Sequence, residues 1–311
     1  FPQATTNIIY QNEACAGTQG LKTVELRYSR EITLNPALFN DPEGYYIIWE
    51  RCCRTDGVDN LENRGRNVGM AFMLEFPALL SNGQFFKNSS PDIGTPNGDY
   101  ICINKPFQMS MKATDADGDE LRYSLVTPLQ GYTTSTAVNG TGQPYSSYPS
   151  VTWAPGFGLT NIIPGKPALG IDSKSGLLTV TAGQLGLFVF AVLVEEYRNG
   201  VKIGSVRRDF QLKVIDCSGT PPPTPTVFTS TNITQPATIV ELCEGSSVDL
   251  AFVAGTDISY QWKKDGSNIP NEKNNALKVT QLGDYQVSAS FAKKCAVDTV
   301  SQLVKVIAGK G

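Results

Sequence analysis

The stretch Ser259-Tyr-Gln-Trp-Lys-Lys-Asp-Gly266 predicts a strand that carries a tryptophan and ends in an Asp-Gly turn. Two later segments, Gly283-Asp-Tyr-Gln-Val-Ser-Ala-Ser290 and Val300-Ser-Gln-Leu-Val-Lys-Val-Ile307, alternate apolar and polar residues as strands do. Upstream, Cys243-Glu-Gly-Ser-Ser-Val-Asp-Leu-Ala-Phe252 indicates a turn that leads into a further strand. These segments together predict a β-sandwich over residues 227–309.

This C-terminal pattern resembles an immunoglobulin-like sandwich. Trp262 and Gly283-Asp284-Tyr285 match the core and corner positions of that family, whereas the cysteines lie outside its usual facing-strand positions. Before it, residues 218–226 hold three consecutive prolines and a fourth nearby. Such a segment favours an extended polyproline conformation, and we expect a semi-rigid linker there.

The sequence upstream of the linker also predicts strands. Residues 101–125 read as a strand, an acidic loop and a second strand, and residues 101–217 together resemble a cadherin-like β-sandwich. Strand-like segments at 23–28, 45–49 and 68–76 predict that residues 1–100 form an irregular β-sandwich, which an upstream segment would complete. The expected fold class is therefore all-β, with tandem β-sandwich domains.

Composition excludes several classes of function. The formal net charge of −3 is spread along the 311 residues without a basic patch, which argues against nucleic acid as a partner. No apolar run is long enough for a membrane span, and Phe1 begins without a leader, so we expect any signal peptide to have been removed. The chain has no histidine, which rules out Ser/His and Cys/His catalysis. We therefore expect no enzyme, with a glycan-acting enzyme based on paired carboxylates as a remote alternative.

The cysteines predict disulfides and an oxidising compartment, because they are widely spaced and no histidine accompanies them. They are Cys15, Cys52, Cys53, Cys102, Cys217, Cys243 and Cys295. The odd number leaves one cysteine free or paired outside the chain. For Cys52 and Cys53 we favour separate bonds over a vicinal disulfide, because neighbouring side chains on a strand point to opposite faces. Two hypotheses stay open for Cys295, which pairs either with Cys243 or with Cys217.

An acidic loop predicts a calcium site. Asp115, Asp117, Asp119 and Glu120 surround Gly118, whose conformational freedom allows a loop to fold around an ion. Calcium prefers several oxygen ligands, and a sandwich loop can supply them without an EF-hand pattern. The alternative is a solvated turn in which the aspartates bond their own backbone.

The connection from 127 to 167 is too long for a plain turn, and we expect a partner surface there. The candidate ligand-surface residues are aromatic side chains that stack on sugar rings or on a partner protein: Tyr132, Tyr145, Tyr148, Trp153 and Phe157. Simple loop packing is the alternative. For Trp49 we expect a position in the core, with neighbouring charges paired at its edge.

Several strings carry a resemblance to a known family. They are Gly44-Tyr-Tyr-Ile-Ile-Trp-Glu-Arg-Cys-Cys-Arg54, Lys87-Asn-Ser-Ser-Pro91, Tyr100-Ile-Cys102, Glu196-Tyr-Arg198 and Ile203-Gly-Ser-Val-Arg-Arg-Asp-Phe-Gln211. Together they resemble the ectodomains of large gliding-motility-associated surface proteins of the Bacteroidota, over roughly the first 217 residues. The C-terminal sorting domain and the upstream mature start of that family are not visible in the chain.

The resemblance implies a secreted protein that is exported by type IX secretion and displayed on the bacterial cell surface. Its expected function is that of a non-enzymatic adhesin or filament segment of the gliding and adhesion apparatus, with a surface glycan or another protein as partner. The alternative is a structural spacer or an assembly component that binds other proteins of the secretion or motility machinery.

Overall fold

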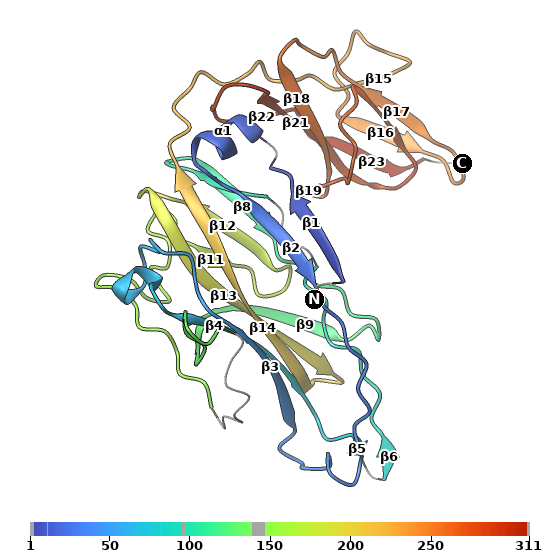
Figure 1. The fold of residues 1–311 in the computed structure, drawn as a ribbon. Coiled ribbons are helices and arrows are strands. Elements are labelled where there is room, and N and C mark those ends of the chain that lie inside the picture. The colour runs from blue at the N-terminus through green and yellow to red at the C-terminus, as the bar shows by residue number, and fades with distance from the viewer. Residues whose placement is uncertain (1–2, 11, 82, 95–97, 139–146, 310–311) are drawn as a thin grey trace. The chain divides into compact units, whose positions relative to one another are not determined.

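The computed structural model describes residues 3–10, 12–81, 83–94, 98–138 and 147–309, and it is all-β, as the sequence predicts. The chain divides into two compact units (Figure 1). Unit 1 consists mainly of Arg27–Pro96 and Tyr100–Asp216, and unit 2 of Pro2–Leu26, Asn97–Asp99 and Cys217–Gly311. The described helical segments are α1 (Glu13–Thr18) and a 3-10 turn at Glu62–Gly65. No helix in the described ranges has the length and apolar character needed to cross a membrane.

Unit 1 is built on a seven-stranded sheet with the order β10-β4-β14-β13-β9, in which β3 pairs with β4 and β7 with β14. Its strands are β3 (Tyr45–Arg51), β4 (Gly69–Phe76), β7 (Ile101–Cys102), β9 (Glu120–Val126), β10 (Leu129–Gly131), β13 (Gly186–Arg198) and β14 (Val201–Ile215). A three-stranded sheet contains β8 (Pro106–Ser110), β11 (Gly170–Ile171) and β12 (Leu177–Thr181), and a short hairpin contains β5 (Leu80–Ser81) and β6 (Gln84–Phe85).

The core of unit 1 lies between the two larger sheets. Alternate residues of β13 supply Phe188, Phe190, Val192 and Val194, all fully buried. Leu178 and other apolar side chains of β12 and β8 belong to the same cluster. Each such side chain contributes roughly 1.5–3 kcal/mol when it leaves water. Val189, on the opposite face of β13, is also fully buried and belongs to a second, smaller cluster.

The expected boundary at residue 100 is not a domain boundary. Ser205–Arg207 of β14 pair with Met73–Glu75 of β4, so strands from both sides of residue 100 share one sheet. Neither segment alone completes this sheet, because β4 has β3 on one side and β10 and β14 on the other. The separate irregular and cadherin-like sandwiches expected for 1–100 and 101–217 therefore share one sheet in unit 1, whereas Pro2–Leu26 belong to unit 2.

Unit 2 contains a sandwich of two sheets. One has the order β15-β17-β20, and the other has the order β16-β23-β21-β18-β19 with β22 paired to β21. Its strands are β15 (Phe228–Thr229), β16 (Ile239–Leu242), β17 (Val248–Ala251), β18 (Ile258–Lys264), β19 (Ser267–Asn268), β20 (Ala276–Val279), β21 (Gly283–Phe291), β22 (Thr299–Val300) and β23 (Val304–Ala308). A separate pair, β1 (Ala4–Ile8) and β2 (Thr23–Arg27), flanks α1 in the sequence.

The immunoglobulin-like features predicted for this sandwich are present. Trp262 of β18 is fully buried, and its indole N–H donates a hydrogen bond of 2.9 Å to the carbonyl oxygen of Asn274. The hydroxyl of buried Tyr285 donates to the carbonyl oxygen of Gln281, 2.9 Å away, which is the tyrosine corner of such domains. Leu250 and Val287 fill the core, and Val287 takes the place where many immunoglobulin domains carry an inter-sheet cysteine.

Candidate functional site

An aromatic face lies on the outer strands of the large sheet in unit 1. It consists of side chains that share one side of β3 and β4, together with one residue of the preceding segment: Tyr28, Tyr45, Ile47, Trp49, Phe72, Leu74 and Phe76. The register pairs Trp49 with Phe72, whose ring centroids are 5.2 Å apart, and Tyr45 with Phe76, at 5.7 Å. The aromatic face lies on the same side of the sheet as the core, because directly paired residues point to the same side. Leu74 pairs with Val206, and Val206 pairs with the buried Val194.

The aromatic face is exposed because the seven-stranded sheet extends beyond the three-stranded sheet that packs on it. No described residue of β3 or β4 belongs to the core between the two sheets. Tyr28, Ile47 and Trp49 are respectively 50%, 49% and 48% exposed. The expected core position for Trp49 is therefore wrong, since β3 lies beyond the edge of the covering sheet. Among the described strands only β4 pairs with β3, so one side of the β3 backbone is open.

A groove of about 340 Å³ lies at the end of β3 and β4. Tyr45, Tyr46 and Phe76 line it together with Pro42 and Pro77. Three charged residues, Glu43, Glu75 and Lys202, also line it, and Lys202 Nζ lies 3.5 Å from Glu75 Oε2. The groove therefore extends the aromatic face with a polar margin, an arrangement found at protein interfaces.

Glu50 points to the opposite side of β3 and binds the long connection at 127–167 through three hydrogen bonds. Its Oε2 accepts hydrogen bonds from the backbone N–H groups of Tyr132 (2.5 Å) and Thr133 (3.1 Å), and its Oε1 accepts one from the Tyr148 hydroxyl (2.7 Å). Burial, reinforced by this bond to Glu50, raises the pKa of Tyr148 above its usual range. Sequence reasoning missed this role, because a carboxylate that binds loop backbone leaves no local pattern.

The structure does not gather the predicted ligand-surface aromatics in one place. Tyr132 and Tyr148 lie together, with ring centroids 5.4 Å apart. Trp153 and Phe157 pack instead against the main core, and Phe157 lies 6.1 Å from the ring of Phe188. Tyr145 lies outside the described residues. The connection is therefore in large part a packing segment, and the continuous aromatic surface lies on β3 and β4.

Of the four predicted calcium ligands, the structure brings two together. Oxygens of Asp115 and Asp119 lie within 4.8 Å of each other and of an oxygen of Glu196. Asp117 instead accepts a hydrogen bond of 2.5 Å from the backbone N–H of Ser89, and Glu120 pairs with Arg122 at 2.8 Å. Asp117 and Glu120 therefore lie outside the cluster. The loop also shows one feature of the alternative prediction, a turn in which the aspartates bond their own backbone: the N–H of Asp117 donates to Asp115 Oδ1.

Glu196 is the member of the cluster that the sequence did not reveal. It lies on β13, far along the chain from the acidic loop, and its residue is only 1% exposed. Burial, above all, raises the pKa of Glu196 to about 7, and the nearby Asp115 and Asp119 carboxylates act in the same direction. The side-chain amide of Asn88 opposes this by donating to Glu196 Oε2 at 2.9 Å. Only the pairing of β13 with β9 brings it beside the loop.

The disulfides differ from those expected. Cys15 of α1 pairs with Cys295, so both hypotheses for Cys295 are wrong. Cys52 pairs with Cys53, so the vicinal bond replaces the separate bonds that we favoured. The strand β3 ends at Arg51, so the alternation of side chains on which that preference rested does not extend to the pair.

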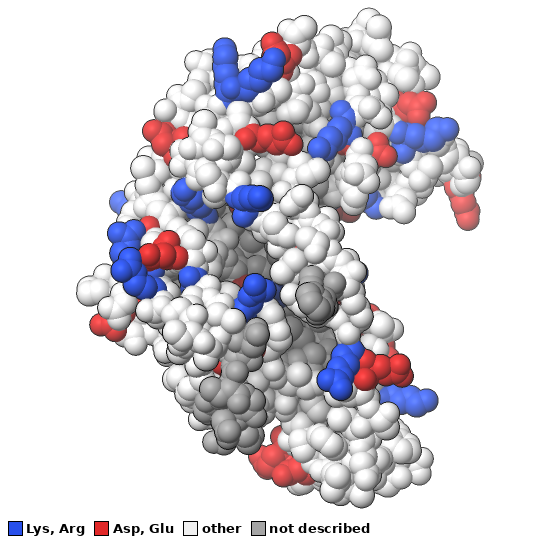
Figure 2. Space-filling model, viewed as in Figure 1, with Lys and Arg blue, Asp and Glu red and all other residues white. Residues whose placement is uncertain are grey.

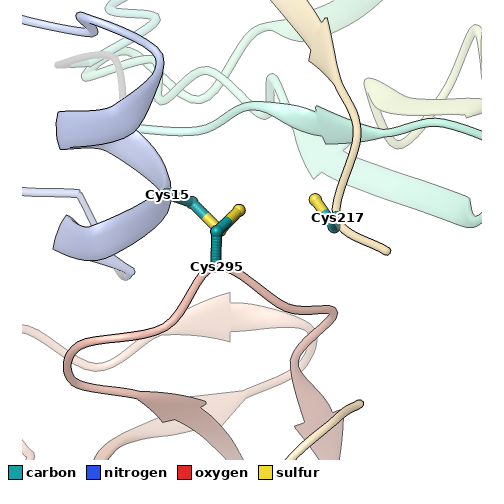
Figure 3. A group of neighbouring side chains, drawn as sticks. All are labelled: Cys15, Cys217 and Cys295. Atoms are coloured by element: carbon teal, nitrogen blue, oxygen red, sulfur yellow. A yellow bond between two sulfur atoms is a disulfide. The ribbon is translucent and has the colours of Figure 1, made fainter. Parts of the chain in front are cut away.

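The remaining cysteines fall into two groups. Cys102 and Cys217 are also disulfide-bonded. Cys217 lies beside the Cys15–Cys295 bond, with the three sulfurs within 4.8 Å of one another (Figure 3). Because these sulfurs are oxidised, they do not form a thiolate metal site. The free thiol among the described residues belongs to exposed Cys243.

Surface charge is mixed in sign. Figure 2 shows Lys and Arg interspersed with Asp and Glu over one face of the molecule. This distribution agrees with the small net charge of −3. The face shown in Figure 2 has no concentration of one charge sign that would steer a highly charged partner. The candidate site is the apolar, aromatic one on β3 and β4.

Comparisons with known proteins identify no family. No family model matches the chain, and no curated protein matches it. Among solved structures it is similar to one described as the structural basis for Dscam isoform specificity, with 11% identity and a TM-score of 0.22 over 78% of this chain. A three-immunoglobulin titin structure (I67–I69) gives 13% identity, 66% coverage of this chain and 61% of that one, and a TM-score of 0.17. The CD2-binding domain of CD58 gives 10% identity, 68% coverage of this chain and 97% of that one, and a TM-score of 0.19.

The chain spans about half, 54%, of the Dscam structure. At such TM-scores the likeness adds nothing to the architecture described above. The immunoglobulin-like character of unit 2 therefore rests on its own strand order, its buried Trp262 and its tyrosine corner.

Proposed function

We propose that this chain is a non-enzymatic adhesion protein of the bacterial cell surface that binds a partner protein through the aromatic face of unit 1. The observation that carries the proposal is the exposure of Ile47 and Trp49 on an open edge strand. Contiguous exposed apolar surface is rare on soluble proteins that have no partner, and aromatic residues dominate the energetics of protein interfaces.

The open edge of β3 favours an extended segment of the partner. A strand that adds to an edge gains backbone hydrogen bonds, and its alternate side chains reach the face beside that edge. Here that face offers Trp49 and Ile47, and the groove lined by Tyr45 and Phe76 lies at one end of it. A partner strand with alternating apolar residues would fit this surface, whereas a glycan would leave the backbone groups of β3 unpaired.

The proposal includes export to the cell surface by type IX secretion. The disulfides support an oxidising compartment, because such bonds persist outside the cytosol. The strings quoted for the gliding-motility resemblance support the surface and the secretion route. One of them, Gly44–Arg54, contains the whole of β3.

Cell attachment tests the proposed function. A strain of the source bacterium that lacks the gene should lose attachment, and the unchanged gene should restore it. We expect that a gene carrying both Ile47→Ser and Trp49→Ser will restore less than about a third of attachment, since truncating central interface anchors costs 2 kcal/mol or more. Val201→Ser removes an even more exposed apolar side chain from the hairpin of β13 and β14 and should restore attachment fully.

The assay also separates an adhesin from a spacer. Surface labelling of each strain confirms that the variant is displayed at the normal level. Full attachment with the displayed double variant would contradict the role of the aromatic face and favour a structural spacer or an assembly component of the motility machinery.

A further inference from the structure

The three clustered carboxylates of unit 1 combine the buried Glu196 with the half-buried Asp115 and Asp119. Asp115 and Asp119 come from the loop before β9, and Glu196 comes from β13. One oxygen of each lies within 4.8 Å of the other two. We propose that these three oxygens bind one calcium ion that fastens the acidic loop to the large sheet. The proposal does not depend on the function of the aromatic face.

Two buried oxygens of the cluster lack a partner. Glu196 Oε1 and Asp115 Oδ2 are inaccessible to solvent, and neither accepts a hydrogen bond from any residue that the structure describes. Buried carboxylate oxygens without a partner are unfavourable, and nearly all buried polar atoms in native proteins are paired. Both atoms belong to carboxylates of the same cluster, so a single cation bound there would give both a partner.

The charge of the cluster matches a divalent ion. When all three carboxylates are ionised they carry three negative charges, and Arg198 is the cation that contacts the cluster, through Asp119 Oδ1 at 2.8 Å and Oδ2 at 2.6 Å. Three negative charges and one positive charge leave a net charge of −2. Because each carboxylate oxygen has a second lone pair, Asp119 is able to serve Arg198 and an ion together.

The ligands are held in place before any ion arrives. Asp115 Oδ1 accepts hydrogen bonds from the N–H groups of Asp117 (2.9 Å) and Asp119 (3.0 Å), which fixes the orientation of Oδ2. Asn88 donates to Glu196 Oε2 and accepts from Arg198, so it orients both side chains. Ordered supporting bonds of this kind are characteristic of metal sites.

The backbone also makes room for the glutamate. Glu196 pairs with Gly204 of β14, and the register of the two strands shifts directly after Glu196. A Cβ atom at position 204 would lie 3.1 Å from Glu196 Oε2 and 2.9 Å from the carbonyl oxygen of Glu75. Only glycine leaves this space free for the carboxylate.

The donor set selects calcium. All the donors are oxygens, which suit calcium and magnesium better than zinc or copper. Calcium takes oxygen ligands at about 2.3–2.6 Å, so oxygens on opposite sides of the ion are up to about 5 Å apart. The three oxygens of the cluster all lie within 4.8 Å of one another, inside that limit. Magnesium requires shorter bonds and near-ideal octahedral geometry, which three carboxylates from a loop and a strand are less suited to provide.

Thermal unfolding of the purified chain tests the site. Protein freed of metal with EGTA is unfolded without added metal, with 5 mM calcium chloride and with 5 mM magnesium chloride, at matched ionic strength. We expect calcium to raise the Tm by about 5 °C, as predicted for an affinity typical of extracellular modules. Magnesium should raise it by less than half as much. Isothermal titration should show one calcium ion per chain.

Matched variants separate this site from other effects of calcium. Glu196→Gln and Asp115→Asn each remove one ligand charge and keep the side-chain size, and both should abolish the shift. Glu120→Gln changes a neighbouring carboxylate outside the cluster and should keep it. An equal Tm with and without calcium in the unchanged protein would overturn the proposal and indicate a proton shared among the carboxylates. A shift that survives in both ligand variants would overturn it as well.

Discussion

In unit 1, the single side chain of Glu50 holds several residues of the connection at 127–167 in place. It accepts two backbone hydrogen bonds and one from a tyrosine hydroxyl, all from the long connection. We predict that Glu50→Ala lowers the free energy of unfolding by about 2 kcal/mol, because hydrogen bonds to a charged acceptor contribute about 1.5–3 kcal/mol each and this group is partly solvated. Urea unfolding followed by circular dichroism measures the change.

Tyr148→Phe provides the graded control for this clamp. It removes the bond to Glu50 Oε1 and keeps the ring next to Tyr132, so we expect a loss of about 1 kcal/mol. Glu31→Ala changes an exposed carboxylate of the same unit and should be neutral. Equal stability of the Glu50→Ala and Glu31→Ala proteins would show that the connection is held by its apolar contacts alone.

Asp298 in unit 2 gives a prediction about pH. Burial raises its pKa, although Ser290, Lys263 and Asn12 act in the opposite direction. Because the folded protein then binds the proton more tightly than the unfolded chain does, stability is fully present below the unfolded pKa of about 3.8 and falls as the pH rises through the raised value. Asp298→Asn should remove this decline, so its Tm relative to the unchanged protein should increase between pH 4 and pH 7.

A Tm difference that stays constant over this pH range would contradict the prediction. Ser290 provides a check on the variant. Because its bond favours the ionised carboxylate, loss of that bond would lower the Tm more at pH 7 than at pH 4, which is the opposite trend to the one predicted. The two effects are therefore distinguishable by the sign of the slope of the pH profile.

Residues differ in how far the sequence determines their place. Trp262 and Tyr285 were predictable, because the tryptophan strand and the Gly-Asp-Tyr corner are local patterns with a fixed structural meaning. Trp49 was not, because its exposure depends on where the covering sheet ends. Asp209 is a further example: its buried pairing with Arg54 joins residues far apart in the chain, and no local spacing indicates it.

At the scale of elements, β14 depends on a glycine where it passes Glu196. We predict that Gly204→Ala lowers the free energy of unfolding by about 2 kcal/mol, since the added methyl group overlaps the Glu75 carbonyl oxygen and the Glu196 carboxylate. It should also reduce the rise in Tm that calcium produces. Gly158→Ala, where nothing lies within 4 Å of the new atom, is the matched control, and an equal effect of both changes would contradict the packing argument.

The existence of most elements was predictable, but their partners were not. The segments expected at 23–28, 45–49 and 68–76 are β2, β3 and β4, and the acidic loop lies before β9 as expected. Alternation of apolar residues reveals a strand, yet it contains no information on which distant strand it joins. The pairing of β4 with β14 therefore merged two expected domains into one sheet, and the pairing of β13 with β9 added Glu196 to the acidic loop.

At the scale of the molecule, the Cys15–Cys295 bond fastens the N-terminal helix to the rest of unit 2. We predict that replacing both cysteines with serine lowers the stability of unit 2 by about 3 kcal/mol, because the bond closes a very long loop in the unfolded chain. The freed N-terminal segment should become a site of early cleavage in limited proteolysis. Cys243→Ser removes an exposed free thiol and should change neither property.

Disulfide partners were the least predictable part of the chain. Seven cysteines allow many pairings, and spacing alone does not distinguish them. Cys15 meets Cys295 because α1 packs within unit 2, a consequence of tertiary structure that no local pattern reveals. The oxidising compartment expected from the number and spacing of the cysteines stays a prediction and part of the proposed function.

Competition for attachment tests the central claim most directly. The purified chain is added in increasing amounts to living cells that produce this protein, before the cells settle on a surface. If the aromatic face binds the partner that mediates attachment, the unchanged chain and the Val201→Ser variant should inhibit attachment equally, and the Ile47→Ser, Trp49→Ser variant should not inhibit it. Equal inhibition by all three proteins, or none by any, would contradict a binding role for this face.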